Sequence, residues 1–481
     1  MNPVCSTVRR SPGGAAAMLA LLLGACSAQP PMPALRTAMP AAYAATSGWR
    51  QAPPAASMPA AGQWWRAFGD TTLDRLEGEL SRHNQSLAAQ LAVYDQAQAA
   101  LRQARAAYAP VVSAQANASR GAVAGASSSV DDQVGAQLSA SWEPDLWGRV
   151  RLQVEQGSAQ LQASADTLRS TRLSLQASLA QSYLQLRVVD AQDRLAGQTV
   201  GAYARALQLT EQRLRAGVAT AADVAQARTQ LLQAQTSRTD LQVTRRQLLD
   251  AIAVLAGRPA PLFDLAAGQA LPSLPRIPAG LPAQLLLRRP DLAAALQQVQ
   301  AANAQIGISQ RAWLPSLTLG ASGGSQAATL AGLLRAPSLY WSLGPSLAAT
   351  LFDGGLRSAQ LASSRAAYRQ AVASYRQDVL QAMQQVQDNL AAQRVLREEA
   401  RQQAEVVQSA RVSLRLALSQ YKAGTVSYLN VITAQTTATA ARNAVLALRQ
   451  RRYAAAVSLI AALGGQWGDS RSGPEGAAER P

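Results

Sequence analysis

The feature that most constrains the fold is a two-residue alternation of small apolar and polar side chains in four stretches of the chain. Two stretches lie within residues 110–143 and two within residues 315–352. This period turns one face of a strand toward lipid and the other toward water, and about 10 residues let a tilted strand cross a bilayer. We therefore expect four membrane-spanning strands in two hairpins. Their apolar positions are Val112, Ala114, Ala116 and Ala118, then Val134, Ala136, Leu138, Ala140 and Trp142, then Leu317, Leu319 and Ala321, and last Trp341, Leu343, Leu347, Ala349 and Leu351.

Four strands are too few to close a barrel, because a closed membrane barrel has about eight strands or more. An open sheet edge in lipid leaves backbone N–H and C=O groups unpaired, at a cost of several kcal/mol for each group. We therefore expect copies of this chain to share one barrel.

The rest of the chain is expected to be mainly helical. Only 5% of the residues are aromatic and 15% are charged, a composition typical of long helices that pack through small side chains. A first helix is expected over residues 73–108. A very long helix is expected over residues 149–215, which at the rise of an α-helix is about 100 Å, with a return helix over residues 221–255. Within residues 149–215, leucines repeat every seven residues, as in a coiled coil. These are Leu161, Leu168 and Leu175.

The second half of the chain repeats the first, so the sequence indicates an internal duplication. Gly217 is matched by Gly424, 207 positions later, and Val372, Val379 and Val386 keep the seven-residue step. We expect a first structural repeat over residues 62–258, with a tip near residue 217, and a second over residues 283–466, with a tip near residue 424. A Pro-rich connector over residues 259–282 joins them.

The N-terminal residues are typical of a bacterial lipoprotein leader. Residues 1–25 have a basic start and an apolar centre, and residues 23–26 match the sequence at which such leaders are cut and acylated. We expect lipidation at Cys26, an extended tether over residues 26–61 and a disordered tail over residues 467–481. Ser27 favours the outer membrane, because an Asp after the cysteine is the usual signal for retention in the inner membrane. No later stretch has the about 18 unbroken apolar residues of a transmembrane helix.

The two expected tips have the residues of helix ends. Gly217 and Gly424 suit the left-handed conformation that ends a helix. Thr220 and Asp223 form a capping box, and Ser427 and Asn430 occupy the same places in the second half. Any helical hairpin would need such residues, and the functional interpretation is that the tips form a rim where a partner docks.

Composition and motifs argue against several other functions. The formal charge is +17, but the basic residues are nearly all Arg, are scattered along the helices and include only one Lys, Lys422. We therefore expect no nucleic-acid partner. The single histidine, His83, has no triad, metal cluster or phosphate loop around it in the sequence. We expect no enzyme activity, no catalytic residue, no metal site and no cofactor.

Three strings of the sequence carry a resemblance to a known family. They are Trp64-Trp65-Arg66-Ala67-Phe68-Gly69-Asp70, then Arg289-Pro290-Asp291 leading to Trp313-Leu314-Pro315-Ser316-Leu317, and Leu351-Phe352-Asp353-Gly354-Gly355. With the lipoprotein leader, the duplication and the four strands, the chain resembles the TolC-like outer membrane efflux channels, in their lipoprotein branch. The resemblance covers essentially the whole mature chain.

The resemblance implies a homotrimer in the outer membrane of a Gram-negative bacterium. Its 12 strands would form one β-barrel, and its coiled-coil hairpins would continue as a periplasmic α-barrel. This passive tube would meet a periplasmic adaptor and an inner-membrane pump of the resistance-nodulation-division class, and would export small molecules such as drugs and toxic organic compounds.

The resemblance also assigns site residues by position. The adaptor-docking tips correspond to Arg215, Gly217, Val218 and Thr220 in one hairpin and Lys422, Gly424, Thr425 and Ser427 in the other. The pore constriction corresponds to Leu429 and Thr433, with Asn430 and Asp223 near it. Related channels carry a carboxylate at the position of Thr433. Its absence implies weaker cation selectivity, unless Asp223 substitutes.

Two alternatives stay open on the sequence alone. A duct for type I protein secretion would have the same architecture but would pass polypeptides. A structural coiled-coil surface lipoprotein would account for the helices and the lipid, but not for the four alternating stretches.

Overall fold

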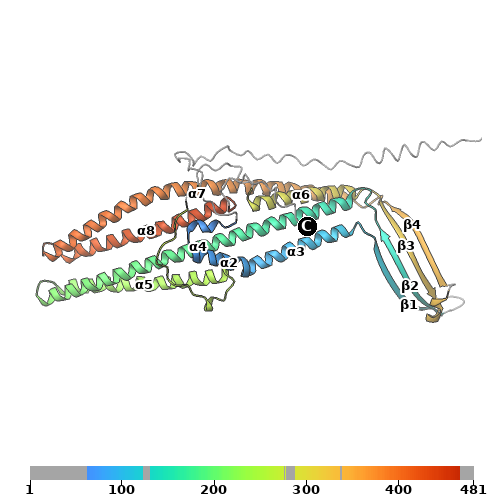
Figure 1. Cartoon of the computed structure of the whole chain (residues 1–481). Coiled ribbons are helices and arrows are strands. Elements are labelled where there is room, and N and C mark those ends of the chain that lie inside the picture. The colour runs from blue at the N-terminus through green and yellow to red at the C-terminus, as the bar shows by residue number, and fades with distance from the viewer. Residues whose placement is uncertain (1–61, 123–129, 276, 278–287, 336–337, 466–481) are drawn as a thin grey trace, which may run out of the picture. The chain divides into compact units, whose positions relative to one another are not determined.

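The computed structural model describes residues 62–122, 130–275, 277, 288–335 and 338–465 (Figure 1). The expected leader, Cys26, the tether and the tail of residues 467–481 lie outside the described residues. The chain divides into two compact units. One contains Tyr94–Ser164 and Ala295–Tyr375, and the other contains the described residues before, between and after these segments.

One helix, two strands, a long helix and a return helix of the first half recur in the second in the same order. The long helices α4 and α7 both have 67 residues, and the return helices α5 and α8 both have 35. These equal lengths are what an internal duplication predicts. In chain order the elements are η2 (Trp64–Phe68), α2 (Thr71–His83), α3 (Gln85–Ala106), β1 (Val111–Ala122), β2 (Val130–Trp142), α4 (Arg149–Arg215), α5 (Ala221–Leu255), η3 (Ala260–Leu262), α6 (Pro290–Arg311), β3 (Ser316–Ala327), η5 (Leu330–Leu334), β4 (Leu339–Ala348), α7 (Leu356–Lys422) and α8 (Tyr428–Ala462).

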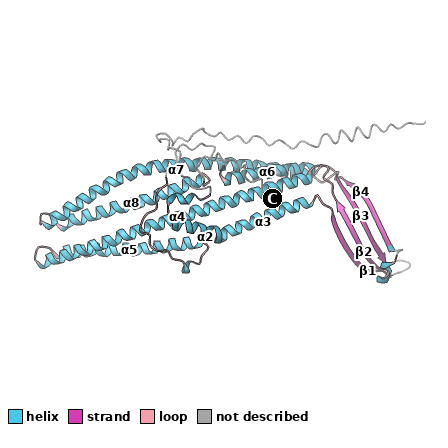
Figure 2. Ribbon diagram, in the orientation of Figure 1, coloured by secondary structure: helices cyan, strands magenta, loops and turns pink. Residues whose placement is uncertain are grey.

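The four strands form one antiparallel sheet in the order β1-β2-β3-β4 (Figure 2). Its register brings apolar positions of neighbouring strands opposite each other, since Ala114 pairs with Leu138 and Ala321 pairs with Leu343. Leu138 is 61% exposed and Leu343 is 76% exposed. The alternation expected from the sequence therefore produces one exposed apolar face, and β1 and β4 are the two edges of the sheet.

The last strand is shorter than the alternation predicts. Ala349 and Leu351 were expected in it, but β4 ends at Ala348. The carboxylate of Asp353 accepts the backbone N–H of Arg357 at 3.1 Å and thereby caps the start of α7. The partner strand β3 begins at Ser316, which pairs with Ala348, so the residues after Ala348 have no partner in the described sheet.

The prediction of one continuous helix over residues 73–108 is wrong. It is two helices, α2 and α3, separated by Asn84 in an extended conformation. The Oδ1 atom of Asn84 accepts the N–H of Leu87, and its Nδ2 atom donates to the carbonyl of Leu255 at the end of α5, both at 2.9 Å. A single side chain thus caps α3 and ties it to α5.

One side-chain network fastens the described part of the connector to α4. Asp190, 3% exposed, accepts from Arg187 at 3.0 Å, from Arg245 of α5 at 3.0 Å and from the backbone N–H of Gly268 at 2.8 Å. Arg187 also donates to the carbonyl of Ala266 at 2.9 Å. Because both carboxylate oxygens are bonded, the buried charge of Asp190 is compensated.

Among the described helices, none combines the length and the hydropathy that crossing a membrane requires.

Candidate docking tips and pore constriction

Both long helices end in the same backbone motif, which forms the two tips. At the end of α4, Gly217 has φ of 74°, and its N–H donates to Leu214 while that of Val218 donates to Arg213, each at 2.9 Å. At the end of α7, Gly424 has φ of 78° and makes the equivalent pair of bonds with its neighbour Thr425. This is the Schellman arrangement, which favours glycine because its φ is positive. The sequence predicted both turns correctly.

The two return helices start differently from each other. Thr220 and Asp223 form the predicted capping box at the start of α5, with each side chain bonded to the backbone N–H of the other residue. Ser427 stands at the equivalent place before α8, but its side chain makes no capping hydrogen bond. The prediction of a second cap from Ser427 and Asn430 is therefore wrong.

The residues assigned to docking all lie at these turns and are all exposed. They are Arg215, Gly217, Val218, Thr220, Lys422, Gly424, Thr425 and Ser427. Val218 is 62% exposed, which is high for a branched apolar side chain. Exposed apolar and basic groups therefore share the tips, and their role in docking stays a prediction.

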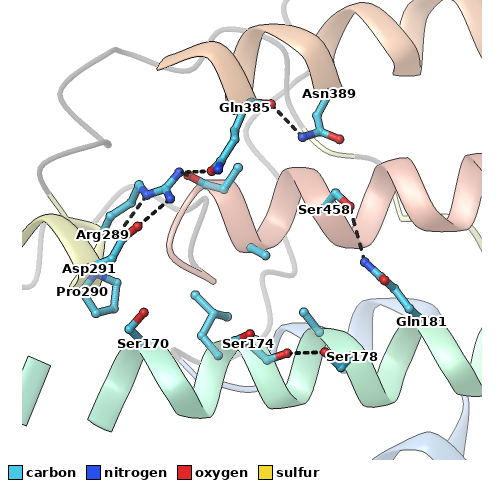
Figure 3. A pocket seen from close by; sticks show the side chains of 14 residues that line it. Ser170, Ser174, Ser178, Gln181, Arg289, Pro290, Asp291, Gln385, Asn389 and Ser458 are labelled. Carbon is cyan, nitrogen blue, oxygen red and sulfur yellow. Dashed lines mark hydrogen bonds and ion pairs between the residues drawn. The ribbon is translucent and has the colours of Figure 1, made fainter. Parts of the chain in front are cut away.

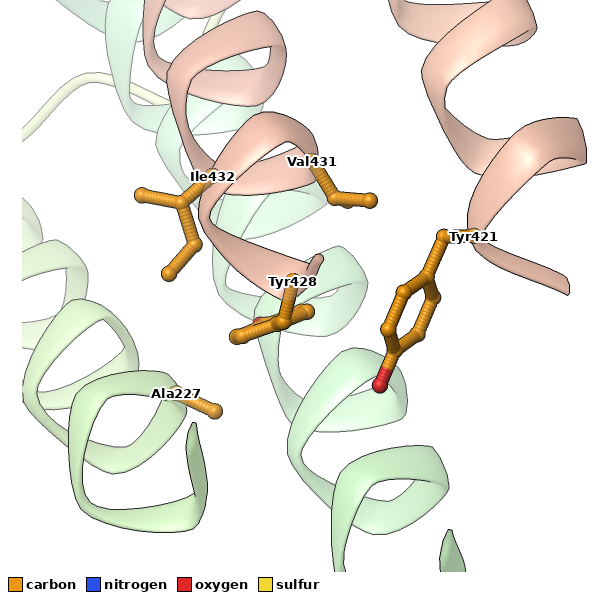
Figure 4. Packing of buried hydrophobic residues seen from close by; sticks show 5 residues of the cluster. All are labelled: Ala227, Tyr421, Tyr428, Val431 and Ile432. Carbon is orange, nitrogen blue, oxygen red and sulfur yellow. The ribbon is translucent and has the colours of Figure 1, made fainter. Parts of the chain in front are cut away.

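A compact aromatic cluster joins the two hairpins close to the tips (Figure 4). Tyr421 of α7 and Tyr428 of α8 have ring centroids 5.5 Å apart, and both side chains are buried. Ala227 of α5 packs in the same cluster. Burial raises the pKa of Tyr428 to about 12, with Tyr421 contributing in the same direction. Tyr428 is therefore neutral at physiological pH.

Arg213 connects the first hairpin to this cluster. Its guanidinium carbon lies 4.5 Å from the ring centroid of Tyr421, and its Nη1 atom donates to the carbonyl of Tyr421 at 3.1 Å. A cation at this carbonyl also meets the negative end of the α7 dipole. Arg213 and both tyrosines are not among the residues predicted from the sequence. The sequence feature that could have indicated this cluster is the presence of one tyrosine on each side of Gly424.

The residues assigned to the constriction lie at the starts of α8 and α5. Leu429 is 55% exposed, and Asn430 and Thr433 are also exposed. The hydroxyl of Thr433 donates to the carbonyl of Leu429 at 3.0 Å, so it is satisfied within its own helix. The Oδ2 atom of Asp223 accepts from the N–H of Thr220 at 2.9 Å and from its hydroxyl at 2.8 Å. The carboxylate of Asp223 is therefore engaged in capping α5.

The Arg289-Pro290-Asp291 string is an internal anchor in the structure (Figure 3). Arg289, 8% exposed, forms a two-bond ion pair with Asp291, at 3.0 and 2.7 Å. Its Nη1 atom donates to Gln385 of α7 at 3.0 Å and to the carbonyl of Ala462, the last residue of α8, at 3.1 Å. The guanidinium thus joins the start of α6 to two other helices. A polar cavity of about 460 Å³ lies beside it.

No group of three or more His, Cys, Asp or Glu side chains among the described residues is arranged to hold a metal ion. His83, at the end of α2, is exposed. The geometry of the described part is that of a helical scaffold with two exposed turns and an apolar-faced sheet.

Comparison with known proteins gives a consistent result along the chain. The family model for outer membrane efflux proteins matches residues 77–258 and 281–465. The chain is 34% identical over 468 residues to the pyoverdine export outer membrane protein OpmQ of Pseudomonas aeruginosa, covering 94% of this chain and 96% of that protein. It is 32% identical over 472 residues to the outer membrane protein OprJ of the same species, covering 96% and 97%.

Solved structures agree with this assignment. The outer-membrane channel OprN superposes with a TM-score of 0.84 at 27% identity, covering 91% of this chain and 99% of that chain. The transmembrane channel CusC superposes with a TM-score of 0.80 at 26% identity, covering 87% and 99%. The chain belongs to the outer membrane efflux protein family.

Proposed function

We propose that three copies of this chain form the outer-membrane channel of a tripartite efflux system, a passive conduit for small molecules. The observation that carries the proposal is the four-stranded sheet, which has an exposed apolar face and two unpaired edges. In lipid those edges require partners. Pairing β1 of one copy with β4 of the next gives a closed barrel of 12 strands in a trimer, within the range of known membrane barrels.

The helical parts would continue the conduit into the periplasm. The exposed tips around Gly217 and Gly424 would meet a periplasmic adaptor, and through it an inner-membrane pump of the resistance-nodulation-division class. Cys26 would carry lipid that anchors each copy in the outer membrane. The channel would supply no energy and catalyse no reaction, so the pump would drive transport. The relatives' names support this proposal, since OpmQ is named for pyoverdine export and ArpC of Pseudomonas putida for antibiotic efflux.

At the narrow end we propose that Leu429 and Thr433 line the constriction, with Asn430 beside them. Three copies of Thr433 would form an uncharged ring. Two hydrogen bonds from Thr220 hold the carboxylate of Asp223 at the start of α5, so it would not enter the ring that Thr433 forms on α8. The entrance would therefore favour cations less than a ring of carboxylates does.

Disulfide cross-linking tests the shared barrel directly. Cys26 is the only native cysteine of the expected mature chain. In this background, one cysteine replaces Asn117 on β1 and a second replaces Ser342 or Ser346 on β4. Oxidation in outer-membrane vesicles is expected to give covalent trimers. The matched control places cysteines at Ser139 and Ser322, which are register partners on β2 and β3. Oxidation of the control should link residues only within one chain. If every β1–β4 pair gave only monomers, the trimeric barrel would be wrong.

Deletion of the gene tests the efflux function. The deleted strain should become sensitive to some members of a panel of drugs, dyes and detergents, and the tagged protein should retain a periplasmic adaptor in a pull-down. Equal sensitivity to every compound would contradict the efflux proposal. A lost secreted polypeptide with unchanged drug sensitivity would instead indicate a type I secretion duct.

A further inference from the structure

A second feature of the molecule has no place in the efflux function, a cavity of about 530 Å³ where η2 and α2 meet α4. It lies within one unit of the chain, away from both tips in sequence. Trp64, Asp74 and Glu77 line it from η2 and α2, Arg172 lines it from α4, and Gly465, just after α8, lies at its edge.

Four buried polar atoms of these lining residues have no hydrogen-bond partner within the described part of the chain. They are both carboxyl oxygens of Glu77, the Oδ1 atom of Asp74 and the indole Nε1 atom of Trp64. Glu77 is 0% exposed. A buried polar atom without a partner costs about 1–3 kcal/mol, and native structures contain few of them. By contrast, no residue that lines the cavity beside Arg289 has such an atom.

Three guanidinium groups line the same cavity and also have no ion-pair partner among the described residues. They belong to Arg66, Arg172 and Arg288, which are all exposed. A fourth, that of Arg169, is bonded to Asp166. The residues on the buried side of the cavity therefore carry three unbonded carboxyl oxygens and one unbonded indole N–H, and those on its exposed side carry unbonded cationic donors.

This arrangement selects the charge of a ligand. A simple anion would meet the carboxyl groups of Asp74 and Glu77, and a simple cation would meet the exposed guanidinium groups. A molecule with both an ammonium and a carboxylate group satisfies both sides at once. The buried position of the acceptors directs the ammonium inward and the carboxylate outward.

We propose that this cavity binds a small zwitterion of the amino-acid type, with its ammonium group bonded to Glu77 and Asp74 and its carboxylate bonded to Arg172 and Arg288. The side chain of Glu77 has to turn toward the cavity for this contact. No hydrogen bond opposes that rotation, because the carboxyl group makes none in the described structure.

Matched ligands test the charge requirement. Alanine and 6-aminohexanoate carry both groups, hexylamine carries only the ammonium, and hexanoate carries only the carboxylate. Calorimetric titration of the purified full-length channel in detergent is expected to show at least one zwitterion binding about tenfold or more tightly than either single-charge compound. If hexylamine or hexanoate binds as tightly as the best zwitterion, or if only water fills the cavity and nothing binds, the proposal is wrong.

Variants test the residues. Glu77→Gln keeps the shape of the side chain and should weaken zwitterion binding about tenfold or more. The double variant Arg172→Gln/Arg288→Gln should also weaken zwitterion binding about tenfold or more, because it removes the positive charges that bind the carboxylate. Arg102→Gln changes an exposed arginine of α3 in the other unit and should bind like the parent. Parent-like binding by both Glu77→Gln and the double variant would overturn the assignment, and the double variant alone decides it if Glu77→Gln does not fold. None of these outcomes depends on the efflux function, which the sensitivity panel tests separately.

Discussion

At the residue scale, Glu77 is the most unusual group in the described structure, because a carboxyl group rarely lies fully buried without a partner. Burial raises its pKa well above the ordinary value, and the nearby Asp74 adds to the effect. Without a bound ligand the folded protein thus prefers the neutral acid, whereas the unfolded chain ionises at an ordinary pKa of about 4.3. An ammonium group bound at the cavity would favour the ionised form.

The raised pKa of Glu77 fixes the direction in which the stability of the folded protein changes with pH. Below the unfolded pKa the carboxyl group is neutral in both states and carries no penalty from ionisation. As the pH rises above that value, the unfolded state gains from ionisation and the folded protein loses stability. The loss is about 1.4 kcal/mol for each pH unit, up to the raised pKa of the folded state.

Glu77→Gln removes this titration and should therefore flatten the pH dependence of stability. Thermal unfolding of the parent and the variant at several pH values between 5 and 8, in buffer without amino acids, measures the difference. The free energy of unfolding of Glu77→Gln, relative to that of the parent, is expected to increase from pH 5 toward pH 8. An advantage that is constant with pH would show that Glu77 is not held neutral.

A second residue-scale prediction concerns Arg213, which bonds the end of α4 to the end of α7. Arg213→Ala should lower the local stability of the tips by about 1 kcal/mol, because the cation–π contact and one hydrogen bond disappear. Hydrogen exchange should become faster at the tips, around residues 421–428. Arg215→Ala, at an exposed position two residues further on, is the matched control and should leave exchange unchanged. Equal exchange in both variants would show that Arg213 does not hold the hairpins together.

At the element scale, Gly217 and Gly257 both follow the end of a helix, but the two positions require glycine for different reasons. Both have positive φ, of 74° and 70°. Among the described residues, a Cβ atom at Gly217 would meet nothing within 4 Å, whereas at Gly257 it would lie 2.1 Å from the carbonyl oxygen of His83. Gly217→Ala should cost only the strain of positive φ, about 1–2 kcal/mol. Gly257→Ala should cost clearly more, because the backbone at His83 must move.

Denaturant unfolding of the two alanine variants beside the parent measures this difference. The ranking is the result that matters, because both substitutions add the same methyl group to the same backbone conformation. Similar losses for the two would mean that the chain at His83 yields readily, and that the close approach of α2 to the end of α5 is not rigid.

The same elements show what local sequence can and cannot predict. The first long helix and its return helix, α4 and α5, were predicted at their observed bounds, since Gly217, Pro259 and the capping box at Thr220 are signals that lie within a few residues of the ends they mark. The break at Asn84 was missed because its cause is the carbonyl of Leu255, far along the chain. The contact of Arg213 with Tyr421 was missed for the same reason, since 208 positions separate the two residues. Pairing of this kind appears only after folding.

At the scale of the whole molecule, one side chain per subunit would be repeated three times around the proposed trimeric channel, so a small change would be multiplied by three. Thr433 is exposed at the start of α8, and its hydroxyl is bonded within the helix. If it lines the constriction, Thr433→Asp places three carboxylates in one ring, which concentrates cations and repels anions there.

Single-channel recording in planar bilayers, with a salt gradient across the membrane, tests this effect. The reversal potential of Thr433→Asp is expected to move toward the equilibrium potential of the cation relative to the parent channel. The shift should shrink at high ionic strength, because salt screens the ring. Thr433→Asn has nearly the same size and no charge, so it should keep the parental reversal potential. An Asp variant with an unchanged reversal potential at low salt would place Thr433 away from the permeation path. The constriction would then have to be sought at other exposed residues of α5 and α8, and the proposed trimeric barrel would be unaffected by this result.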